Sequence, residues 1–526
     1  MAPYKNTLII ANRSPIDFRH PVGEGEDARL TVGGLVSGMS GLLKDGSTTW
    51  VGMAGGMYDF HHCLGEGRPK TKAIRVYDPG EHRVVFNDGT YDFAMKKVFL
   101  PKVTVSKYYN RFCNGFLWPL MHITYPEITK SKTFPMPTFN PRDYMHYKMA
   151  NTTFANAAIE EYPEGTGKRI PIWVQDYHFM LVPNKLRELE KAGENPLIGQ
   201  FIHIPFFGWF ADEVMRGENG TYSSTMKDLL EGMLGNDLLG FHVPSYVEDF
   251  ADVAKGHLRC SVKDDGDFRV IEHNGRRTYL GAFPIGVDVE TVLSQTGEEP
   301  LVYMRDDLPK DGGLSELIEK RRKKGFKILT GLERMDYTKG VVERLKVVER
   351  LLEMGENVTY IGFSSPSRGD SPGYKELAQG TRKVVDGINE RFKPFLGFEP
   401  IVWRKDGIYP PQNYRLMRDA DVVMVTSLED GFNLVIPEGI LAKKYADPEN
   451  RGPMVIGRCG ASHELRDFGE DDGLVRIDPL DVNGSAETVR STMDRNVSDR
   501  LISHVETRMD ISEWRDRFMS ALYDIA

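Results

Sequence analysis

The sequence predicts an α/β protein with two doubly wound domains, each built on a parallel sheet that helices cover on both faces. Short, continuous apolar runs alternate with helix-length segments along the whole chain of 526 residues. Such runs are typical of parallel strands that are buried on both faces. A chain of this length exceeds the size that one hydrophobic core serves, and it suits two large domains.

Nine apolar runs are expected to form the strands of the two sheets. They are residues 7–11, 50–53, 171–174, 198–202 and 238–243 in the first half, and residues 326–332, 358–363, 421–425 and 453–457 in the second half. The segment 281–289 precedes a loose stretch around 296–313 and marks the candidate boundary. We therefore expect one domain at residues 1–289 and the other at residues 290–505.

Three aspartates in the segment 263–279 suggest a metal site at first sight: Asp264, Asp265 and Asp267. The D-D-G-D and N-G steps of this segment are also the turns expected of two successive β-hairpins. Because the aspartate spacing fails the pattern of a calcium-binding loop, hairpins are the preferred interpretation.

The end of the chain, residues 506–526, is predicted to be a closing helix. Asp510 and Glu513 have the spacing of a capping box. Three apolar residues then fall on one helical face at intervals of four: Trp514, Phe518 and Leu522. This periodicity is typical of an amphipathic helix.

The composition excludes several classes of protein. The chain carries 67 Lys and Arg against 76 Asp and Glu, whereas nucleic-acid binding calls for a basic domain or stripe. Its four scattered cysteines predict neither a disulfide framework nor a zinc site. The N-terminus enters a strand-like run at once, and no apolar stretch reaches membrane-spanning length. We expect a cytoplasmic protein that binds neither nucleic acid nor a membrane.

Ligands of doubly wound domains bind beside the carboxyl ends of the strands, so the residues after each strand are the candidates for chemistry. Arg334 and Lys339 lie in one turn after the run 326–332. A forked guanidinium and a compact ammonium together suit a diphosphate. The alternative is a pair of solvated surface cations, which the position at a strand end makes the less favoured interpretation.

The stretch S-L-E-D-G-F-N-L-V-I-P-E-G, at 427–439, follows another buried apolar run. Its turn is expected at Gly431. The helix that begins near Asn433 has free amides that can face a phosphate. The two acids of the stretch, Asp430 and Glu438, lie on either side of that helix start.

Two arginines and a glycine pair occupy comparable positions elsewhere. Arg13 and Arg368 each follow an expected strand, where an arginine alone is ordinary. Gly33 and Gly34 precede a helical run and permit close approach of the backbone to a ligand, although a lone glycine pair is usually just a turn.

Polar and aromatic residues complete the set of candidates. Asp176 and His203 end two expected strands in apolar surroundings, where catalytic residues and satisfied core residues are equal alternatives. Tyr109 and Trp118 belong to the unusually aromatic segment 107–122. Such rings are core in most chains, but sugar binding also uses aromatic faces, so both interpretations stay open.

In order and spacing, these loops resemble the trehalose-6-phosphate synthase family of retaining glycosyltransferases, almost from end to end of the chain. The motifs are N-R (12–13), G-G-L (33–35), Y-Y-N-x-F-x-N-x-x-L-W-P (108–119), D-Y-H (176–178), H-I-P-F (203–206), D-L-L-G-F (237–241), P-I-G-V (284–287), E-R-x-D-Y-x-K-G (333–340), S-R-G-D (367–370) and D-G-x-N-L-V-x-x-E (430–438). Each is modest alone, and their shared order makes the resemblance specific.

The resemblance implies a GT-B fold, in which two Rossmann-like domains face each other across a deep cleft and the C-terminal helix returns to the N-terminal domain. It implies transfer of glucose, with retention of configuration, from a nucleotide-diphosphate glucose to glucose 6-phosphate, with UDP-glucose the favoured donor. No cofactor and no metal are implied, because fixed cations and oriented amides can stabilise the departing diphosphate.

The resemblance also implies roles for individual residues. Arg334 and Lys339 would hold the donor diphosphate, Glu438 the ribose, and Asp430 the transferred glucose, with His203 beside that sugar. Expected at the reaction centre are His203, Arg334, Lys339 and Asp430. Expected to bind the donor are Gly34, Arg334, Lys339, Asp430, Asn433, Leu434, Val435 and Glu438. Expected to bind the acceptor are Arg13, Tyr109, Trp118, Asp176 and Arg368.

The chain departs from the family pattern on the acceptor side. Met53 stands in W-V-G-M where the family commonly has W-x-G-W, and Gln175 begins Q-D-Y-H where the usual motif begins with His. The loop Phe206–Phe210 replaces a proline-containing turn, and the Gly/Ser-rich segment 215–224 looks longer than usual. These changes leave the donor residues whole and concern the part of the site that selects the acceptor.

Two alternatives to a trehalose-6-phosphate synthase therefore stay open. One is a relative with another phosphorylated acceptor, such as a glucosylglycerol-phosphate synthase or a cyclitol pseudo-glycosyltransferase. The other is a catalytically silent sugar-phosphate sensor, which the intact charged residues disfavour. The sequence leaves open UDP, GDP or ADP as the donor nucleotide, and it leaves open a homo-oligomer.

Overall fold

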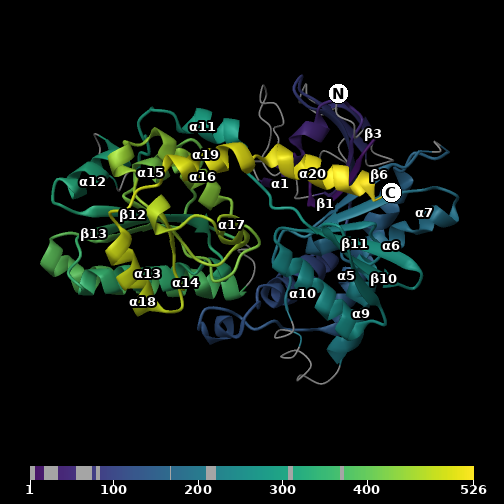
Figure 1. Cartoon of the computed structure of the whole chain (residues 1–526), viewed down its shortest axis with the longest axis horizontal. Helices are drawn as coiled ribbons and strands as arrows, with labels where there is room; N and C mark the ends of the chain where they lie inside the picture. Colours follow the sequence, from purple (N-terminus) through teal and green to yellow (C-terminus); the bar gives the residue numbers. More distant parts are fainter. Residues whose placement is uncertain are drawn as a thin grey trace. The chain divides into compact units, whose positions relative to one another are not determined.

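The computed structural model describes residues 6–16, 34–54, 74–78, 83–165, 168–208, 212, 221–305, 308, 312–367 and 372–525. Contacts divide the chain into two compact units. Unit 1 comprises Met1–Thr124, Pro137–Phe283 and Trp514–Ala526, and unit 2 comprises Tyr125–Met136 and Pro284–Glu513. Each unit combines a sheet with helices (Figure 1). The units differ from the domains expected at 1–289 and 290–505 chiefly in residues 125–136, which group with unit 2.

The sheet of unit 1 has eleven strands within the described residues, in the order β3-β4-β5-β2-β1-β6-β7-β8-β11-β10-β9. The strands are β1 Leu8–Arg13, β2 Thr49–Met53, β3 Ile74–Asp78, β4 Arg83–Asn87, β5 Asp92–Val98, β6 Pro171–Gln175, β7 Leu197–Phe201, β8 Leu238–Phe241, β9 Ser261–Asp265, β10 Phe268–His273 and β11 Arg276–Ala282. From β5 to β11 the neighbours are parallel. The chain moves from β1 to β2 on one side and later to β6 on the other, so the strand order reverses between β1 and β6.

The five strands expected in this half are confirmed, and so is the hairpin interpretation of residues 263–279. β10 pairs antiparallel with both β9 and β11. Strands β3, β4 and β5 were not anticipated, because their sequences mix charged with apolar residues and lack a continuous apolar run. The turn between β4 and β5 carries Asp88-Gly89, a hairpin signal that could have revealed them.

The C-terminal helix α20, Ile511–Asp524, packs on the sheet of unit 1 through the apolar face predicted from its sequence (Figure 1). The three residues of that face are at most 1% exposed: Trp514, Phe518 and Leu522. The Phe518 ring stacks on Trp173 of β6, with the ring centroids 4.7 Å apart. A Cβ on Gly240 of β8 would lie only 2.7 Å from Phe518, so the missing side chain makes room for this ring.

The sheet of unit 2 has six parallel strands within the described residues, in the order β14-β13-β12-β15-β16-β17. The strands are β12 Lys327–Arg334, β13 Val358–Ser365, β14 Ile401–Arg404, β15 Val422–Val425, β16 Met454–Ile456 and β17 Leu474–Arg476. This is the strand order of a Rossmann-like sheet, which reverses between β12 and β15. The four strands expected here are confirmed, whereas the short edge strands β14 and β17 were not anticipated.

Helices connect the strands in both units (Figure 1). Those of unit 1 include α1 Gly34–Met39, α3 Lys102–Val105, α4 Trp118–Met121, α5 Pro141–Glu160, α6 Val182–Leu186, α7 Glu188–Lys191, α9 Thr221–Met233 and α10 Pro244–His257, with the π-helical stretch Ser106–Leu117 between α3 and α4. Those of unit 2 include α11 Val289–Thr296, α12 Gly313–Arg322, α13 Val341–Glu353, α14 Pro372–Leu396, α15 Gln412–Asp419, α16 Val435–Ala442, α17 Gly460–Glu464, α18 Val482–Thr492 and α19 Asp499–Arg508.

Candidate functional site

Many of the described candidates form two clusters, one in each unit, near carboxyl ends of strands. The unit 1 cluster consists of Arg13, Tyr109, Asp176, His178 and His203. The unit 2 cluster consists of Arg334, Lys339, Asp430 and Asn433. Each cluster lies where the strand order of its own sheet reverses, beside β1 and β6 in unit 1 and beside β12 and β15 in unit 2. Loops diverge at such a point, and it is where doubly wound sheets bind their ligands.

A tight connection between β12 and α13 positions Lys339. Asp336 accepts a hydrogen bond from the Thr338 N–H at 3.2 Å and caps the short helical turn that ends at Lys339. Gly340 then has a φ of 60°, and a Cβ on it would lie 2.3 Å from the carbonyl oxygen of Thr426. Glycine therefore allows this turn to pack against the end of β15.

Lys339, which follows β12, and Asp430, which follows the neighbouring strand β15, form an ion pair at the carboxyl ends of these strands. Their side chains are largely buried, at 12% and 11% exposure. Ser427 Oγ lies 3.5 Å from the Asp430 carboxylate, and Asn433 Nδ2 donates a hydrogen bond to Ser427 Oγ at 3.0 Å. The pair therefore connects the loop after β12 with the loop after β15.

The left-handed residue of the stretch 427–439 is Asn433, with a φ of 73°, rather than Gly431. Asparagine tolerates this conformation because its short polar side chain bonds to nearby backbone. Here Asn433 Oδ1 accepts a hydrogen bond from the Val435 N–H at 3.2 Å. Leu434 precedes the first residue of α16. The Val435 amide, which was expected to face a phosphate, therefore donates to Asn433 in this structure.

Arg334 is exposed at the end of β12, and its neighbour Glu333 belongs to a buried network. Glu333 forms an ion pair with Arg344 and accepts a hydrogen bond from Ser364 Oγ at 2.6 Å. Arg344 Nη1 donates to the Met424 carbonyl at 2.9 Å. The network joins β12, β13, β15 and α13 at the residue that precedes Arg334. Sequence reasoning missed it, although a glutamate in an apolar strand was an available signal.

Glu438 lies in the first turn of α16. Burial raises the pKa of its carboxyl from 4.5 to about 8. Burial, and to a lesser degree the Glu438 charge, also raises the pKa of Tyr414 on α15. At neutral pH the Glu438 carboxyl is therefore mostly protonated, and hydrogen-bond donors from a ligand would favour its ionised form.

The unit 1 cluster forms a continuous row of side chains. Arg13 Nη2 donates a hydrogen bond to the Tyr109 hydroxyl at 3.3 Å. The Tyr109 ring stacks on His178 with centroids 5.7 Å apart, and His178 Nδ1 lies 3.7 Å from Asp176 Oδ2. His178 is part of the D-Y-H motif but was not among the site residues expected from the sequence.

Asp176 connects this row to His203. It has a φ of 71°, an uncommon value for a residue with a side chain. Its N–H donates to the Phe201 carbonyl at 2.7 Å, and its Oδ1 accepts a hydrogen bond from the His203 N–H at 3.2 Å. These bonds hold the strained turn at a strand end, a kind of place where functional residues cluster.

His203 is neutral near pH 7 and has a defined hydrogen-bond partner. Burial, with a smaller contribution from His242, holds the pKa of His203 well below 6.5. His203 Nε2 lies 2.9 Å from Gln175 Oε1. An amide oxygen only accepts hydrogen bonds, so Nε2 carries the proton and Nδ1 is left as an acceptor. Gln175 thereby acquires a role that the sequence marked only as a departure from the family.

Three other predicted residues are not part of either cluster. Trp118 is 5% exposed and packs on His122 and Tyr177, so the structure favours the core interpretation of its ring. Gly34 is the first residue of α1. Arg368 lies outside the described residues.

The departures from the family pattern are described in part. Met53 is half-buried at the end of β2. Phe206 and Phe207 are buried and stack on each other with centroids 5.0 Å apart. Residues 209–211 and 213–220, which include the end of this loop and part of the segment 215–224, lie outside the described residues.

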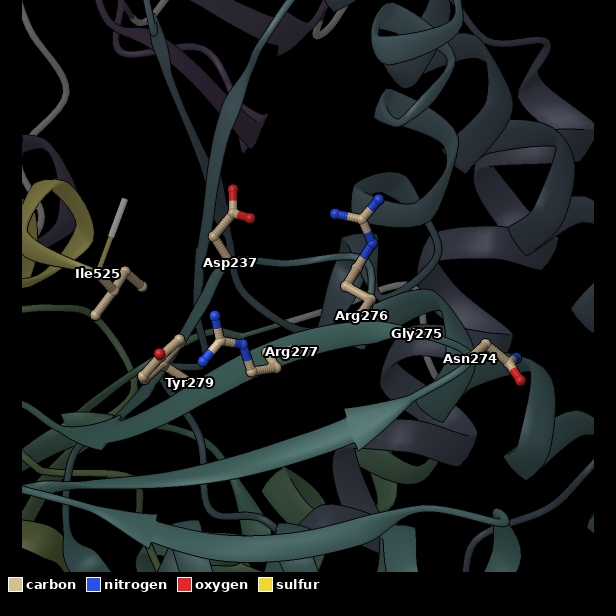
Figure 2. A pocket seen from close by; sticks show the side chains of 7 residues that line it. All are labelled: Asp237, Asn274, Gly275, Arg276, Arg277, Tyr279 and Ile525. Carbon is tan, nitrogen blue, oxygen red and sulfur yellow. The ribbon is translucent and has the colours of Figure 1, made fainter.

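A separate pocket of about 350 Å³ lies at the opposite, amino-terminal edge of the unit 1 sheet (Figure 2). Arg276, which lines it, pairs with Glu190 at 2.8 Å, and Asp237, which also lines it, pairs with Arg187 at 2.9 Å. The other lining residues are Asn274, Gly275, Arg277, Tyr279 and Ile525. None of the predicted site residues lines this pocket, so it is distinct from both clusters.

In the described ranges of the chain, no group of three or more His, Cys, Asp or Glu side chains is arranged to hold a metal ion. Likewise, none of the helices described is both long enough and apolar enough to cross a membrane.

Known proteins resemble the chain over nearly its full length. The alpha,alpha-trehalose-phosphate synthase (UDP-forming) of Schizosaccharomyces pombe is 28% identical over 532 residues, covering 99% of this chain and 91% of that protein. The 56 kDa subunit of the Saccharomyces cerevisiae enzyme is 27% identical, with 98% and 94% covered. A crystal structure of an alpha,alpha-trehalose-phosphate synthase (UDP-forming) from Burkholderia xenovorans, in complex with glucose 6-phosphate, has 26% identity and a TM-score of 0.72, covering 98% of this chain and 100% of that chain.

The fold, the two clusters and these similarities agree with the match to a family. The sequence model of glycosyltransferase family 20 covers residues 5–524. Since this match spans almost the whole chain, the protein belongs to glycosyltransferase family 20.

Proposed function

We propose that this protein transfers glucose from UDP-glucose to glucose 6-phosphate and forms trehalose 6-phosphate with retention of the anomeric configuration. Membership of glycosyltransferase family 20 supports the reaction class. The names of the relatives and the glucose 6-phosphate complex of the Burkholderia xenovorans protein support the substrates. The observation that carries the proposal is the pairing of Lys339 with Asp430 where the unit 2 sheet reverses its strand order.

In the proposed donor site, Lys339 and Arg334 bind the diphosphate, and Asp430 binds hydroxyls of the transferred glucose. The ammonium of Lys339 has three donors, so it can keep Asp430 and still bind a phosphate oxygen. When the donor binds, the hydrogen bond from the Val435 N–H to Asn433 breaks, and this N–H donates to the phosphate instead. The positive end of the α16 dipole then faces the phosphate.

The nucleoside end of the donor lies along the same helix in this proposal. The Leu434 amide assists with the phosphate, and Glu438 accepts hydrogen bonds from the ribose hydroxyls. Those hydroxyls stabilise the ionised carboxylate, whose desolvation otherwise raises its pKa. Donor binding is therefore coupled to release of a proton from Glu438.

Transfer breaks the bond from glucose C1 to the diphosphate oxygen and forms a bond from C1 to the acceptor hydroxyl oxygen on the same face. Negative charge develops on the departing diphosphate, and fixed cations stabilise that charge most in the transition state. The proton of the acceptor hydroxyl passes to the departing phosphate oxygen. His203, neutral beside the sugar, contributes a hydrogen bond rather than a charge.

The proposed acceptor site uses the unit 1 cluster. Arg13, Tyr109 and Arg368 bind the phosphate of glucose 6-phosphate, while Gly34 and Asp176 line the sites around it. The hydrogen bond from Arg13 to Tyr109 supports the first part, because it already holds two of the three phosphate ligands together. Trp118 is buried, so we assign it a packing role behind this site.

An activity matrix on the purified protein tests the proposal. UDP-, GDP- and ADP-glucose are each assayed against glucose 6-phosphate, glycerol 3-phosphate and glucose, with release of the nucleotide as the signal. We expect the highest turnover with UDP-glucose and glucose 6-phosphate. If no nucleotide is released with glucose 6-phosphate, the proposed reaction is wrong, and stabilisation by ligands without any turnover would indicate a sensor.

A second candidate function is a synthase with another phosphorylated acceptor. Met53 and Gln175 favour it, since both replace residues that the family commonly has on the acceptor side. Turnover with glycerol 3-phosphate but not with glucose 6-phosphate would identify a glucosylglycerol-phosphate synthase. Turnover with neither, but with a phosphorylated cyclitol, would identify a pseudo-glycosyltransferase.

A further inference from the structure

Residues 125–136 lie between two parts of unit 1 in the sequence, yet they pack as part of unit 2. The segment contains a short helical turn, Pro126–Lys130, and several of its side chains are buried. Tyr125 is 8% exposed and Phe134 is 6% exposed. The segment therefore contributes to the folded structure of unit 2 rather than lying loosely over it.

Tyr125 is the point where three loops of the unit 2 sheet meet. Its hydroxyl donates a hydrogen bond to the Leu428 carbonyl at 3.0 Å, in the loop after β15. The Leu428 N–H donates in turn to the Thr338 carbonyl at 2.8 Å, in the turn after β12. Arg458, in the loop after β16, places its guanidinium 3.8 Å from the centroid of the Tyr125 ring. The backbone N–H of Arg458 donates a hydrogen bond to the Ser427 carbonyl at 3.0 Å.

The other end of the segment contacts the same turn and the helix that follows it. The Phe134 ring meets Tyr337 edge to face, with centroids 5.0 Å apart. The hydroxyls of Ser131 and Thr133 donate to the Glu343 carboxylate at 2.9 and 3.1 Å, in the first turn of α13. The segment thus holds both sides of the turn that carries the proposed phosphate-binding lysine.

We propose that Tyr125 is a positioning residue for the nucleotide-sugar donor. It acts through Leu428, whose carbonyl accepts a hydrogen bond from the Tyr125 hydroxyl and whose N–H donates to Thr338, so that it fixes the spacing between the loops that carry Lys339 and Asp430. The inference rests on the proposed function of those two residues. It assigns the donor geometry in part to a segment that no motif of the donor site includes.

The physical basis is that Leu428 is held by hydrogen bonds at both its carbonyl and its N–H. Without the Tyr125 hydroxyl, the buried Leu428 carbonyl loses its hydrogen-bond donor, and the loop relaxes to recover one. Lys339 and Asp430 lie on the two loops that Leu428 connects, so the relaxation changes their spacing. A diphosphate that needs both loops in place then binds less tightly, while acceptor residues of unit 1 keep their own contacts.

The test compares full-length wild-type protein with Tyr125→Phe, which keeps the ring over Arg458 and deletes only the hydroxyl. The matched control is Tyr144→Phe, which deletes a hydroxyl that donates to Asp228 at 2.9 Å in unit 1. We measure the Kd of UDP by calorimetry and the KM of glucose 6-phosphate at saturating UDP-glucose. Tyr125→Phe should weaken UDP binding about five- to tenfold, the loss expected for one hydrogen bond, and leave the acceptor KM within about twofold. Tyr144→Phe should not weaken UDP binding while leaving the KM of glucose 6-phosphate unchanged.

Several results would overturn the inference. A Kd of UDP unchanged by Tyr125→Phe, or an equal rise in the acceptor KM, would show that Tyr125 has no specific effect on the donor. If Tyr125→Phe does not fold, Phe134→Leu takes its place, because it removes the edge contact with Tyr337. It should likewise weaken UDP binding and leave the KM of glucose 6-phosphate unchanged. Wild-type protein that binds no UDP would contradict the proposed function as well as this inference, and that distinguishes the two failures.

Discussion

Replacing Glu438 with glutamine should stabilise the protein above neutral pH and at the same time weaken donor binding. The folded carboxyl has a pKa of about 8, against an ordinary value of 4.5, because burial disfavours its charged form. Between those values the folded protein binds a proton that the unfolded chain does not, so wild-type stability falls as the pH rises through this range. Glutamine has nearly the same shape and no titration, so Glu438→Gln does not lose this stability.

The structure sets the size of the effect. The two pKa values are 3.5 pH units apart. Each unit is worth about 1.4 kcal/mol, which gives a ceiling of about 5 kcal/mol, and partial contact of the side chain with water lowers the expected value to about 3 kcal/mol. For a unit of this size the gain corresponds to a rise in Tm of about 2 to 4 °C per kcal/mol.

Calorimetric unfolding between pH 4.5 and pH 9 measures this effect as the difference between Glu438→Gln and wild type. The difference should be near zero at the acid end, grow with pH, and level off above pH 8. Glu487→Gln, an exposed position on α18, is the control and should stay close to wild type throughout. A constant offset between Glu438→Gln and wild type, independent of pH, would show that folding does not raise the pKa of the Glu438 carboxyl.

Donor binding gives the second half of this prediction. If ribose hydroxyls bind the ionised carboxylate, wild type should release a proton on binding UDP below pH 8. Its affinity for UDP should then rise by up to about tenfold per pH unit between pH 6 and pH 8, in excess of the change for Glu438→Gln. Calorimetric titrations in two buffers of different ionisation enthalpy measure the proton release. Parallel pH profiles for wild type and variant would show that Glu438 does not bind the ribose.

Three further changes probe other parts of the account. Lys339→Ala should lower kcat/KM about 100-fold or more, because it removes the positive charge proposed to stabilise the departing diphosphate. Full turnover by this variant would show that Lys339 does not stabilise the diphosphate. Gln175→Leu removes the acceptor that fixes the proton on His203 Nε2, so nitrogen NMR of the imidazole should detect both tautomers, whereas wild type shows one; an unchanged spectrum would contradict the assignment. Gly340→Ala should cost about 1–3 kcal/mol in unfolding experiments because its Cβ meets a backbone carbonyl, while Gly380→Ala on α14, with open space around it, should be neutral or stabilising.

Much of the fold could be predicted because it depends on local patterns. Nine apolar runs became the central strands of the two sheets, and the four-residue spacing from Trp514 identified the buried face of α20. Strands β3, β4 and β5 were missed because their sequences mix charged with apolar residues and contain no continuous apolar run. The grouping of residues 125–136 with unit 2 depends on contacts made more than 200 residues away in the sequence, and no local pattern reports them.

The candidate site could be predicted as a set of residues but not as a set of contacts. Motif spacing put Lys339 and Asp430 on separate loops, and only the strand order of the folded sheet brings them into an ion pair. The turn was expected at Gly431, but the residue with the left-handed conformation is Asn433, whose side chain bonds within this turn. The raised pKa of Glu438 follows from tertiary burial, to which the sequence offered no guide.

The most direct test of the central claim is proton NMR of the product formed when purified protein is incubated with UDP-glucose and glucose 6-phosphate. We expect stoichiometric release of UDP and a new anomeric signal with the small coupling of an α-linked glucose, which shows retention. An anomeric signal with the large coupling of a β-linkage would contradict the front-face mechanism. An unchanged spectrum, with no UDP released, would contradict the proposed reaction itself.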